Sequence, residues 1–223
     1  DADLPAQRHV PHRRRDPGPG HAMIVLVPRE RFERWVLNFS GRHGEAALVV
    51  ADGALTGSAA DGSTFVARLP FLAAYAGPPD AAAFTTEIGP PADWGLLLVR
   101  KGGFGVARLA GERVVESKIG QRHVQGRTKA GGQSQQRFAR RRDNQARQAY
   151  EAAAGHAARI LGAGPLPVVT GGDHGAVDEV LADPRLDRLT VVGPWLAVAD
   201  PRRDVLEQAI ADACSVAVDV VNA

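Results

Sequence analysis

The residues best suited to chemistry in this sequence are two adjacent glycines, Gly131 and Gly132, and the glutamines after them, Gln133 and Gln135. Glycine lets the backbone approach a ligand closely. Glutamine does not titrate, but its side-chain amide and its backbone N–H can orient a water molecule and hold a developing oxyanion. Such groups suit the hydrolysis of an ester in a site where RNA supplies much of the remaining machinery. The alternative for the bare tripeptide is a flexible surface loop.

Positive charge surrounds these residues, and no Asp or Glu lies between Ser117 and Arg142. The net charge of the chain is only +2, so the local clustering of positive charge is more informative than the net charge. Consecutive arginines without acidic partners repel one another unless an anion is present. We therefore expect contacts with RNA phosphates, the alternative being a solvated helix surface. The predicted RNA-binding residues are Lys118, Arg122, Arg127, Lys129, Gln136, Arg137, Arg140, Arg141 and Arg142, with His123 close by.

Metal and disulfide chemistry find little support in the sequence. The seven histidines are dispersed, and the single cysteine, Cys214, excludes an internal disulfide and a cysteine-rich metal site. Asp173 and His174, with Asp178 and Glu179 nearby, would resemble a nuclease-type metal site, but helix capping by Asp173 is the simpler interpretation. We therefore predict no metal and no organic cofactor.

The first 22 residues are predicted to be a disordered tail, with Met23 as the natural start. They join three arginines, Arg13, Arg14 and Arg15, to a Pro-Gly repeat, and they lack the apolar core of a secretory signal. No apolar run in the chain approaches the length that a bilayer span needs. We therefore expect no membrane partner and a cytoplasmic location.

The first half of the chain is expected to form a small α/β region. Expected strands cover residues 24–27, 46–50 and 64–69, with Asp-Gly turns between the last two. Phe32, Trp35, Val36 and Phe39 recur at helical spacing, which predicts a helix over residues 29–42. Proline pairs at 78–79 and 90–91 place a boundary near residue 91, so that residues 23–90 form an N-terminal subregion and residues 91–223 a second domain.

The second half carries a regular alternation of strands and helices around the glycines. Expected strands cover residues 94–100, 104–109, 113–117, 166–170 and 189–192. Expected helices cover residues 136–161 and 176–181, and a third begins near residue 201. Residues 120–135 have no hydrophobic periodicity and are expected to form a mobile, basic, glycine-rich loop. This order predicts an α/β fold with a mixed β-sheet flanked by helices.

The string Gly131-Gly132-Gln133-Ser134-Gln135-Gln136-Arg137-Phe138-Ala139-Arg140 resembles the peptidyl-transferase-centre motif of archaeal and eukaryotic class-I peptide-chain release factors. In those proteins the motif also follows a three-strand meander and opens a long helix in the middle domain. Residues 168–173 and 183–186 resemble two further segments of that domain, so the resemblance covers roughly residues 94–215. No stop-codon-reading domain precedes this region in the sequence, which makes the chain more similar to the VLRF-type peptidyl-tRNA hydrolases linked to rescue of stalled ribosomes.

That resemblance implies an enzyme that releases the nascent peptide from tRNA on stalled ribosomes or large subunits without recognising a stop codon. It makes residues 91–223 the catalytic domain, with peptidyl-tRNA and large-subunit ribosomal RNA as partners. The release-factor pattern assigns catalysis to Gln133, whereas the Gly-x-x-Gln pattern of the VLRF branch fits Gln135, and both stay open. The alternatives are a non-catalytic RNA-binding module associated with the ribosome and a tRNA-cleaving nuclease on the same scaffold.

Overall fold

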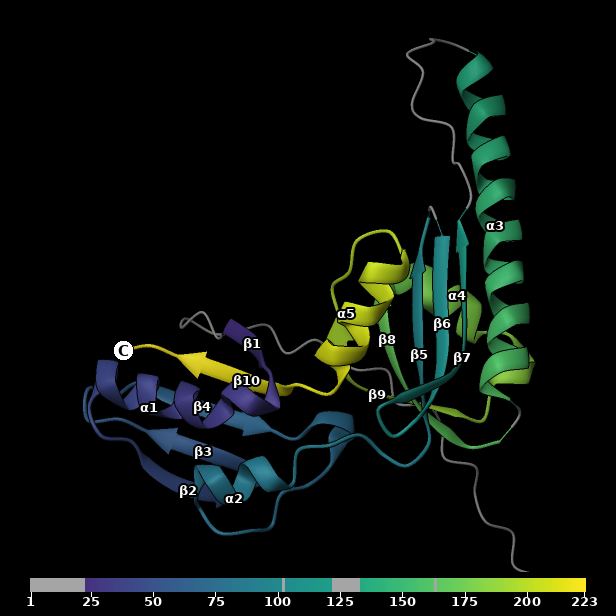
Figure 1. Ribbon diagram of the computed structural model, residues 1–223. Helices are drawn as coiled ribbons and strands as arrows, with labels where there is room; N and C mark the ends of the chain where they lie inside the picture. Colours follow the sequence, from purple (N-terminus) through teal and green to yellow (C-terminus); the bar gives the residue numbers. More distant parts are fainter. Residues whose placement is uncertain (1–22, 102, 122–132, 163) are drawn as a thin grey trace, which may run out of the picture.

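Two β-sheets with helices packed on them make up the protein, as the computed structural model in Figure 1 shows. The structure describes residues 23–101, 103–121, 133–162 and 164–223. Sheet A, on the left of Figure 1, has the strand order β1-β10-β4-β3-β2. Sheet B, on the right, has the order β7-β6-β5-β8-β9. The predicted α/β class is therefore confirmed, with two sheets in place of one.

Sheet A is antiparallel throughout. Its strands are β1 (Met23–Val27), β2 (Ala47–Ala51), β3 (Ala54–Ser58), β4 (Thr64–Arg68) and β10 (Val216–Val221). The strands expected at 24–27, 46–50 and 64–69 are confirmed. The sequence did not reveal β3, which the weak strand-former Gly57 interrupts, or β10, whose apolar residues follow the last helix with only two residues between.

The strand β10 joins distant parts of the chain. It lies between β1 and β4, so residues after 91 complete a sheet that residues before 91 begin. The division into residues 23–90 and 91–223 stays a prediction, and sheet A takes strands from both sides of it.

Aromatic side chains fill the core between sheet A and its helices. The elements on this side are α1 (Phe32–His43), α2 (Ala81–Thr86) and the 3-10 turn η1 (Arg29–Arg31). A second 3-10 turn, η2 (Pro70–Leu72), contacts sheet B instead. Phe32, Val36 and Phe39 are buried along one side of α1, as their spacing predicted. The rings of Phe39 and Phe65 meet edge to face with centroids 5.0 Å apart.

Sheet B is mixed, because an antiparallel meander is followed by two parallel strands. The meander consists of β5 (Trp94–Arg100), β6 (Gly103–Ala110) and β7 (Arg113–Gln121), and the parallel strands are β8 (Leu166–Gly172) and β9 (Leu189–Leu196). The strand β5 lies in the middle, pairing with β6 and β8. Six of its seven residues are buried, which is expected for a strand covered on both faces.

Helices cover both faces of sheet B. These helices are α3 (Gln133–Leu161), α4 (His174–Leu181) and α5 (Arg203–Ala213), and a 3-10 turn, η3 (Pro184–Leu186), precedes β9. Leu97 and Val99 of β5 pack in the core beneath α3 and α4, whereas Leu96 and Leu98 pack in the core beneath α5. The predicted helices are confirmed, but the long one begins at Gln133, three residues earlier than its apolar pattern indicated.

A glycine at the end of β8 allows the close approach of β5. Gly172 has φ of +107°, and a Cβ there would lie 2.2 Å from the carbonyl oxygen of Val99. We expect Gly172→Ala to lower the free energy of unfolding by at least ~2 kcal/mol. The control is Gly155→Ala in α3, where a Cβ meets nothing within 4 Å, and this change should raise stability by up to ~1 kcal/mol. Urea denaturation of both variants measures the two effects, and equal stabilities would contradict this packing.

Candidate functional site

The start of α3, which holds Gln133 and Gln135, lies far from the buried residues that hold this helix on sheet B. The buried residues of α3 in the described part of the helix begin at Ala149, sixteen residues after Gln133. At 1.5 Å per residue, this separation places Gln133 about 24 Å along the helix from the first buried side chain. Figure 1 shows residues 133–148, here called the projecting segment, extending beyond the end of sheet B.

Small apolar residues, one ring stack and one ion pair hold the other half of α3 on the sheet. The buried residues are Ala149, Ala153, Ala154, Ala157, Ile160 and Leu161. The His156 ring stacks on Phe104 of β6 at 5.4 Å between centroids, and Arg159 forms an ion pair with Glu116 of β7 at 2.5 Å. Both contacts join α3 to the strands that lead to the tip.

The carboxyl end of α3 is fixed separately. Gly162 ends the helix with φ of +80°, the left-handed conformation that glycine adopts most readily. Arg108 of β6 donates to the carbonyl oxygen of Leu161 at 3.4 Å and forms two hydrogen bonds with Asp93, at 3.1 and 2.5 Å. Asp93 raises the pKa of the Arg108 guanidinium, so this anchor keeps its charge.

The two candidate glutamines occupy different positions on the helix. Gln133 is the first residue of α3 and Gln135 the third, so their backbone positions lie about 200° apart around the helix axis. The backbone N–H groups of the first four helical residues have no acceptor within the helix, and the helix dipole adds partial positive charge there. A helix that begins at Gln133 therefore presents free N–H donors next to both amides.

The predicted RNA-binding residues fall into three groups. Lys118 is exposed on β7 and pairs with Val106, which lies in the core beneath α3, so it is on the α3 side of the sheet. Gln136, Arg137, Arg140, Arg141 and Arg142 lie on the projecting segment of α3. Outside the described residues lie Arg122, His123, Arg127, Lys129, Gly131 and Gly132.

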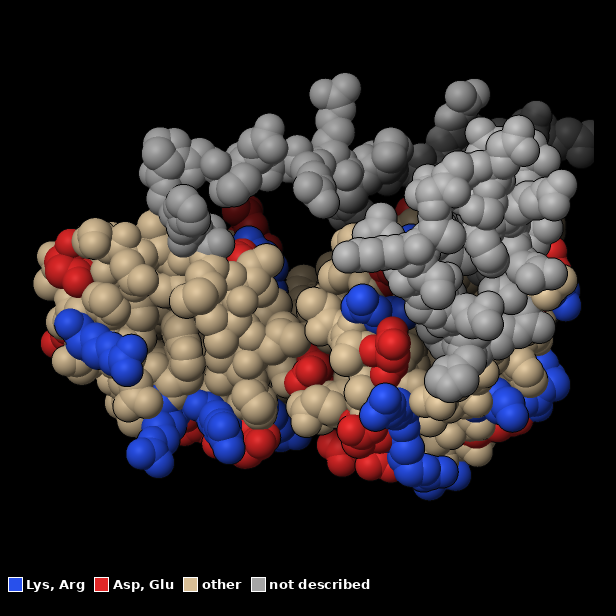
Figure 2. Space-filling model, turned by 90° about the horizontal axis from the view of Figure 1, so that it is seen from above, with Lys and Arg blue, Asp and Glu red and all other residues tan. Residues whose placement is uncertain are grey.

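The described surface around the projecting segment carries both signs of charge. Figure 2 looks down on this end of the molecule and shows lysines and arginines interspersed with aspartates and glutamates. The described surface in this view therefore forms no single basic face.

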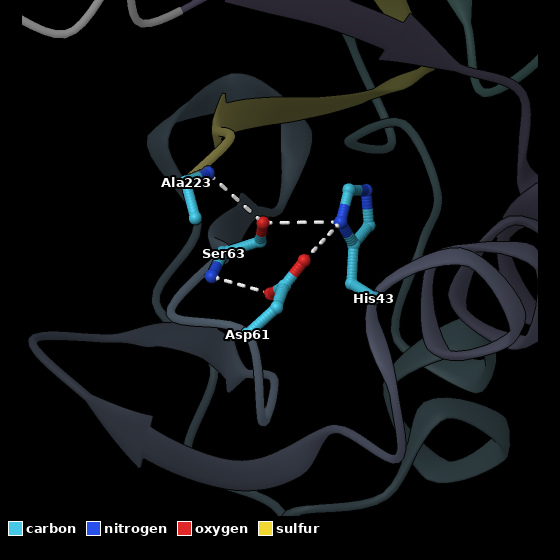
Figure 3. Close-up of polar contacts among 4 residues, drawn as sticks. All are labelled: His43, Asp61, Ser63 and Ala223. Carbon is cyan, nitrogen blue, oxygen red and sulfur yellow. Dashed lines mark hydrogen bonds and ion pairs between the residues drawn. The ribbon is translucent and has the colours of Figure 1, made fainter.

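A serine, a histidine and an aspartate meet at one end of sheet A, an arrangement that the sequence did not reveal (Figure 3). The Asp61 carboxylate lies 2.8 Å from Nδ1 of His43, and the Ser63 hydroxyl lies 3.0 Å from the same nitrogen. In a catalytic triad the acid and the nucleophile bind opposite ring nitrogens, so that a proton can pass through the imidazole. Here both bind Nδ1, and Ser63 is fully buried, which excludes this relay.

This cluster has a structural role. Ser63 accepts a hydrogen bond from the backbone N–H of Ala223 at 3.1 Å, and its own N–H donates to Asp61 at 2.8 Å. The backbone N–H of Ser63, followed by His43, lowers the pKa of the Asp61 carboxyl below its ordinary 3.8. The cluster thus joins the end of α1, the turn before β4 and the segment after β10.

The residues considered for a metal site do not assemble one. Among the residues that the structure describes, no group of three or more His, Cys, Asp or Glu is placed to hold a metal ion. His174 instead stacks on Trp195, with ring centroids 3.6 Å apart. Asp173 is at the N-cap position of α4, but its side chain makes no capping hydrogen bond, so that part of the prediction was wrong.

Within the described ranges, no helix is both long and apolar enough to cross a bilayer.

The meander, the glycine-glutamine tip and the long helix after it define a release-factor-like protein. The sequence profile of the Actinobacteria/chloroflexi VLRF1 release factor family matches residues 92–219, from just before β5 into β10. The chain therefore belongs to the VLRF1 release factor family, which confirms the resemblance seen in its sequence.

Similarity to individual proteins is weaker. A solved structure, the Vms1 mitochondrial localization core, is 12% identical over 83% of each chain, with a TM-score of 0.35. No curated protein sequence matches the chain.

The cluster around Asp61 predicts a pH dependence of stability. A carboxyl whose pKa is lowered by folding adds stability above its unfolded pKa, here 3.8, and this stability is lost as the pH falls through the folded pKa. Asp61→Asn should therefore be less stable than wild type at pH 7, with a difference that shrinks between about pH 5 and pH 3. Urea denaturation across this range measures the difference.

The control is Gly172→Ala in sheet B, which removes none of the groups that lower the pKa of Asp61. Its loss of stability should stay constant over the same pH range. If the stability difference between Asp61→Asn and wild type did not change with pH, folding would not lower the pKa of the Asp61 carboxyl.

Proposed function

We propose that the protein hydrolyses the ester that joins a nascent peptide to tRNA on stalled ribosomes or large subunits, without recognising a stop codon. The observation that carries the proposal is the position of Gln133, directly after two glycines, at the first residue of a helix anchored about 24 Å away. Membership of a release factor family supports the same reaction class. We place this activity in the cytoplasm.

In the proposed reaction, a water molecule attacks the ester carbonyl carbon. The oxygen of the terminal ribose leaves and takes a proton, so the products are a free peptide acid and an intact tRNA. Glutamine orients the water through its amide, while backbone N–H groups at the helix start stabilise the oxyanion. Gly131 and Gly132 add no side chains at the point of closest approach. The chain contributes donors and position, and the RNA surroundings contribute the rest.

The two glutamines remain competing candidates for the amide that holds the water. Their backbone positions lie on roughly opposite sides of α3, so a bound ribose next to one faces away from the other. We assign the role to Gln133, because it directly follows the glycines, and we keep Gln135 as the alternative.

The proposed partners are peptidyl-tRNA and large-subunit ribosomal RNA. Arg137, Arg140, Arg141 and Arg142 lie on the projecting segment, within the length that separates the tip from the anchored half. Charges spread along a straight helix match phosphates spread along an RNA strand, and they give affinity without base specificity. Lys118, on β7 beside the anchored half of α3, extends the set.

Release of labelled peptide from purified stalled complexes tests the catalytic assignment. We expect Gln133→Ala to slow release by at least ~100-fold, because one oriented donor is lost, and Gln135→Ala to have a smaller effect. Ser63→Ala is the control, since the buried serine beside His43 is not part of the proposed site. Wild-type rates in both glutamine variants would disprove the assignment and leave a non-catalytic binding module, whereas a shortened tRNA 3′ end would indicate a nuclease.

Salt dependence tests the docking role of the arginines. Replacing Arg140, Arg141 and Arg142 by alanine should weaken binding to large subunits and reduce the slope of log Kd against log salt by roughly 2. The control removes the same charge from exposed arginines beside sheet A, Arg29, Arg31 and Arg34, and should leave the slope unchanged. Equal slopes for the two triple variants would exclude a specific role for the projecting segment.

A further inference from the structure

The open edges of the two sheets differ in how they are protected. Edge strands carry unpaired backbone groups, and proteins usually protect them with charges, prolines, bulges or covering elements. In sheet B, β7 carries Arg113, Glu116 and Lys118, and β9 contains Pro194 and a register shift. In sheet A, β2 consists of Ala47-Leu48-Val49-Val50-Ala51 and has none of these features. The opposite edge, β1, directly follows residues that the structure does not describe.

The outer side of β2 is free to pair. Its only strand partner is β3, in a register without shifts, and no backbone hydrogen bond joins residues 47–51 to any other described segment. Val49, at its centre, is 52% exposed, whereas Leu48 and Val50 are half-buried. Figure 1 shows β2 as the strand of sheet A farthest from β10, on the side away from β1. An apolar strand of this kind is a template for a further strand.

The sequence of β2 is complementary to itself. Antiparallel pairing about Val49 sets Ala47 opposite Ala51 of a second copy and Leu48 opposite Val50. The acidic residues just outside the strand do not oppose each other, because Glu45 falls opposite Gly53 and Asp52 opposite Ala46. Every pair in this register is therefore apolar or lacks like charges, which favours strand pairing.

We propose that β2 pairs with β2 of a second copy of this chain, antiparallel and centred on Val49, to give a ten-stranded sheet across a twofold axis. A twofold operation brings the same surface together on both copies, which a self-complementary strand allows. One strand pair lies at the small end of stable protein interfaces, so the dimer is concentration-dependent. This surface lies on sheet A and goes beyond the proposed peptide release.

Sedimentation equilibrium of the purified full chain tests the pairing. Val49→Lys sets two ammonium groups opposite each other and should raise the dimer dissociation constant by at least roughly tenfold. The matched control is Val191→Lys on the edge strand β9, where the valine is 48% exposed, and it should dimerise like wild type. A wild type that stays monomeric at the highest soluble concentration, or a dimer that Val191→Lys disrupts and Val49→Lys does not, overturns the proposal.

Disulfide trapping supplies a test that does not depend on affinity. In the proposed register, Val49→Cys brings two thiols within the Cα separation that a disulfide accepts. The natural Cys214 competes little, because burial raises the pKa of its thiol to about 11. Val49→Cys should form a covalent dimer on mild oxidation, and Val191→Cys should not. Equal cross-linking of the two variants would indicate random collision and refute the pairing. An absence of cross-linking in Val49→Cys would also refute it. Peptide release is measured separately, and neither Val49→Cys nor Val191→Cys should change it.

Discussion

The close approach of α3 to sheet B is the contact on which the rest of the structure depends. Alanine at 149, 153 and 157 lets the helix lie near the strands, since no large side chain separates them. Such a stripe of alanines sets the distance between helix and sheet. Because it buries little apolar area per residue, it determines the rotation of the helix about its axis less well. The pair of Arg159 with Glu116 and the stack of His156 on Phe104 fix that rotation. The direction of the projecting segment follows from these contacts.

A helix suits the projecting segment better than a loop of equal length. Each residue of an unstructured loop keeps its conformational freedom, and ordering it on a ribosome would cost roughly 1–2 kcal/mol of free energy per residue. The helix meets this cost during folding of the protein. A preformed helical support of this kind is consistent with the proposed delivery of a few backbone donors to a distant ester.

Sequence reasoning found the elements of sheet B because each has a clear period or boundary. The meander alternates with glycine turns, and α3 carries an apolar stripe from Tyr150 to Ile160. It missed β10, because an apolar run of six residues fits a helix or a buried strand equally well, and only its partners β1 and β4 decide. It missed the meeting of His43, Asp61 and Ser63 for the same reason. Their proximity comes from the fold, and no local pattern carries it.

The start of α3 shows where the apolar pattern stops being informative. Residues 133–135, Gln-Ser-Gln, are helical but wholly polar, so they carry no apolar stripe. Hydrophobic periodicity arises from packing against a core, so it does not identify a helical segment made of polar residues. The candidate site was therefore visible in the sequence as a motif, and its placement at the start of a long projecting helix required the structure.

The position of β10 also sets the order in which this protein can fold during its synthesis. The strands β1, β2, β3 and β4 are made first, but β10 lies between β1 and β4, and all residues of sheet B are made before it. Until then β1 has no neighbour in sheet A. Sheet B can form as soon as β9 is complete, so the later part of the chain is expected to fold before the earlier part, the reverse of the usual sequence. A ribosome that stops within β9 or α5 would leave sheet A unfinished and its apolar strands exposed.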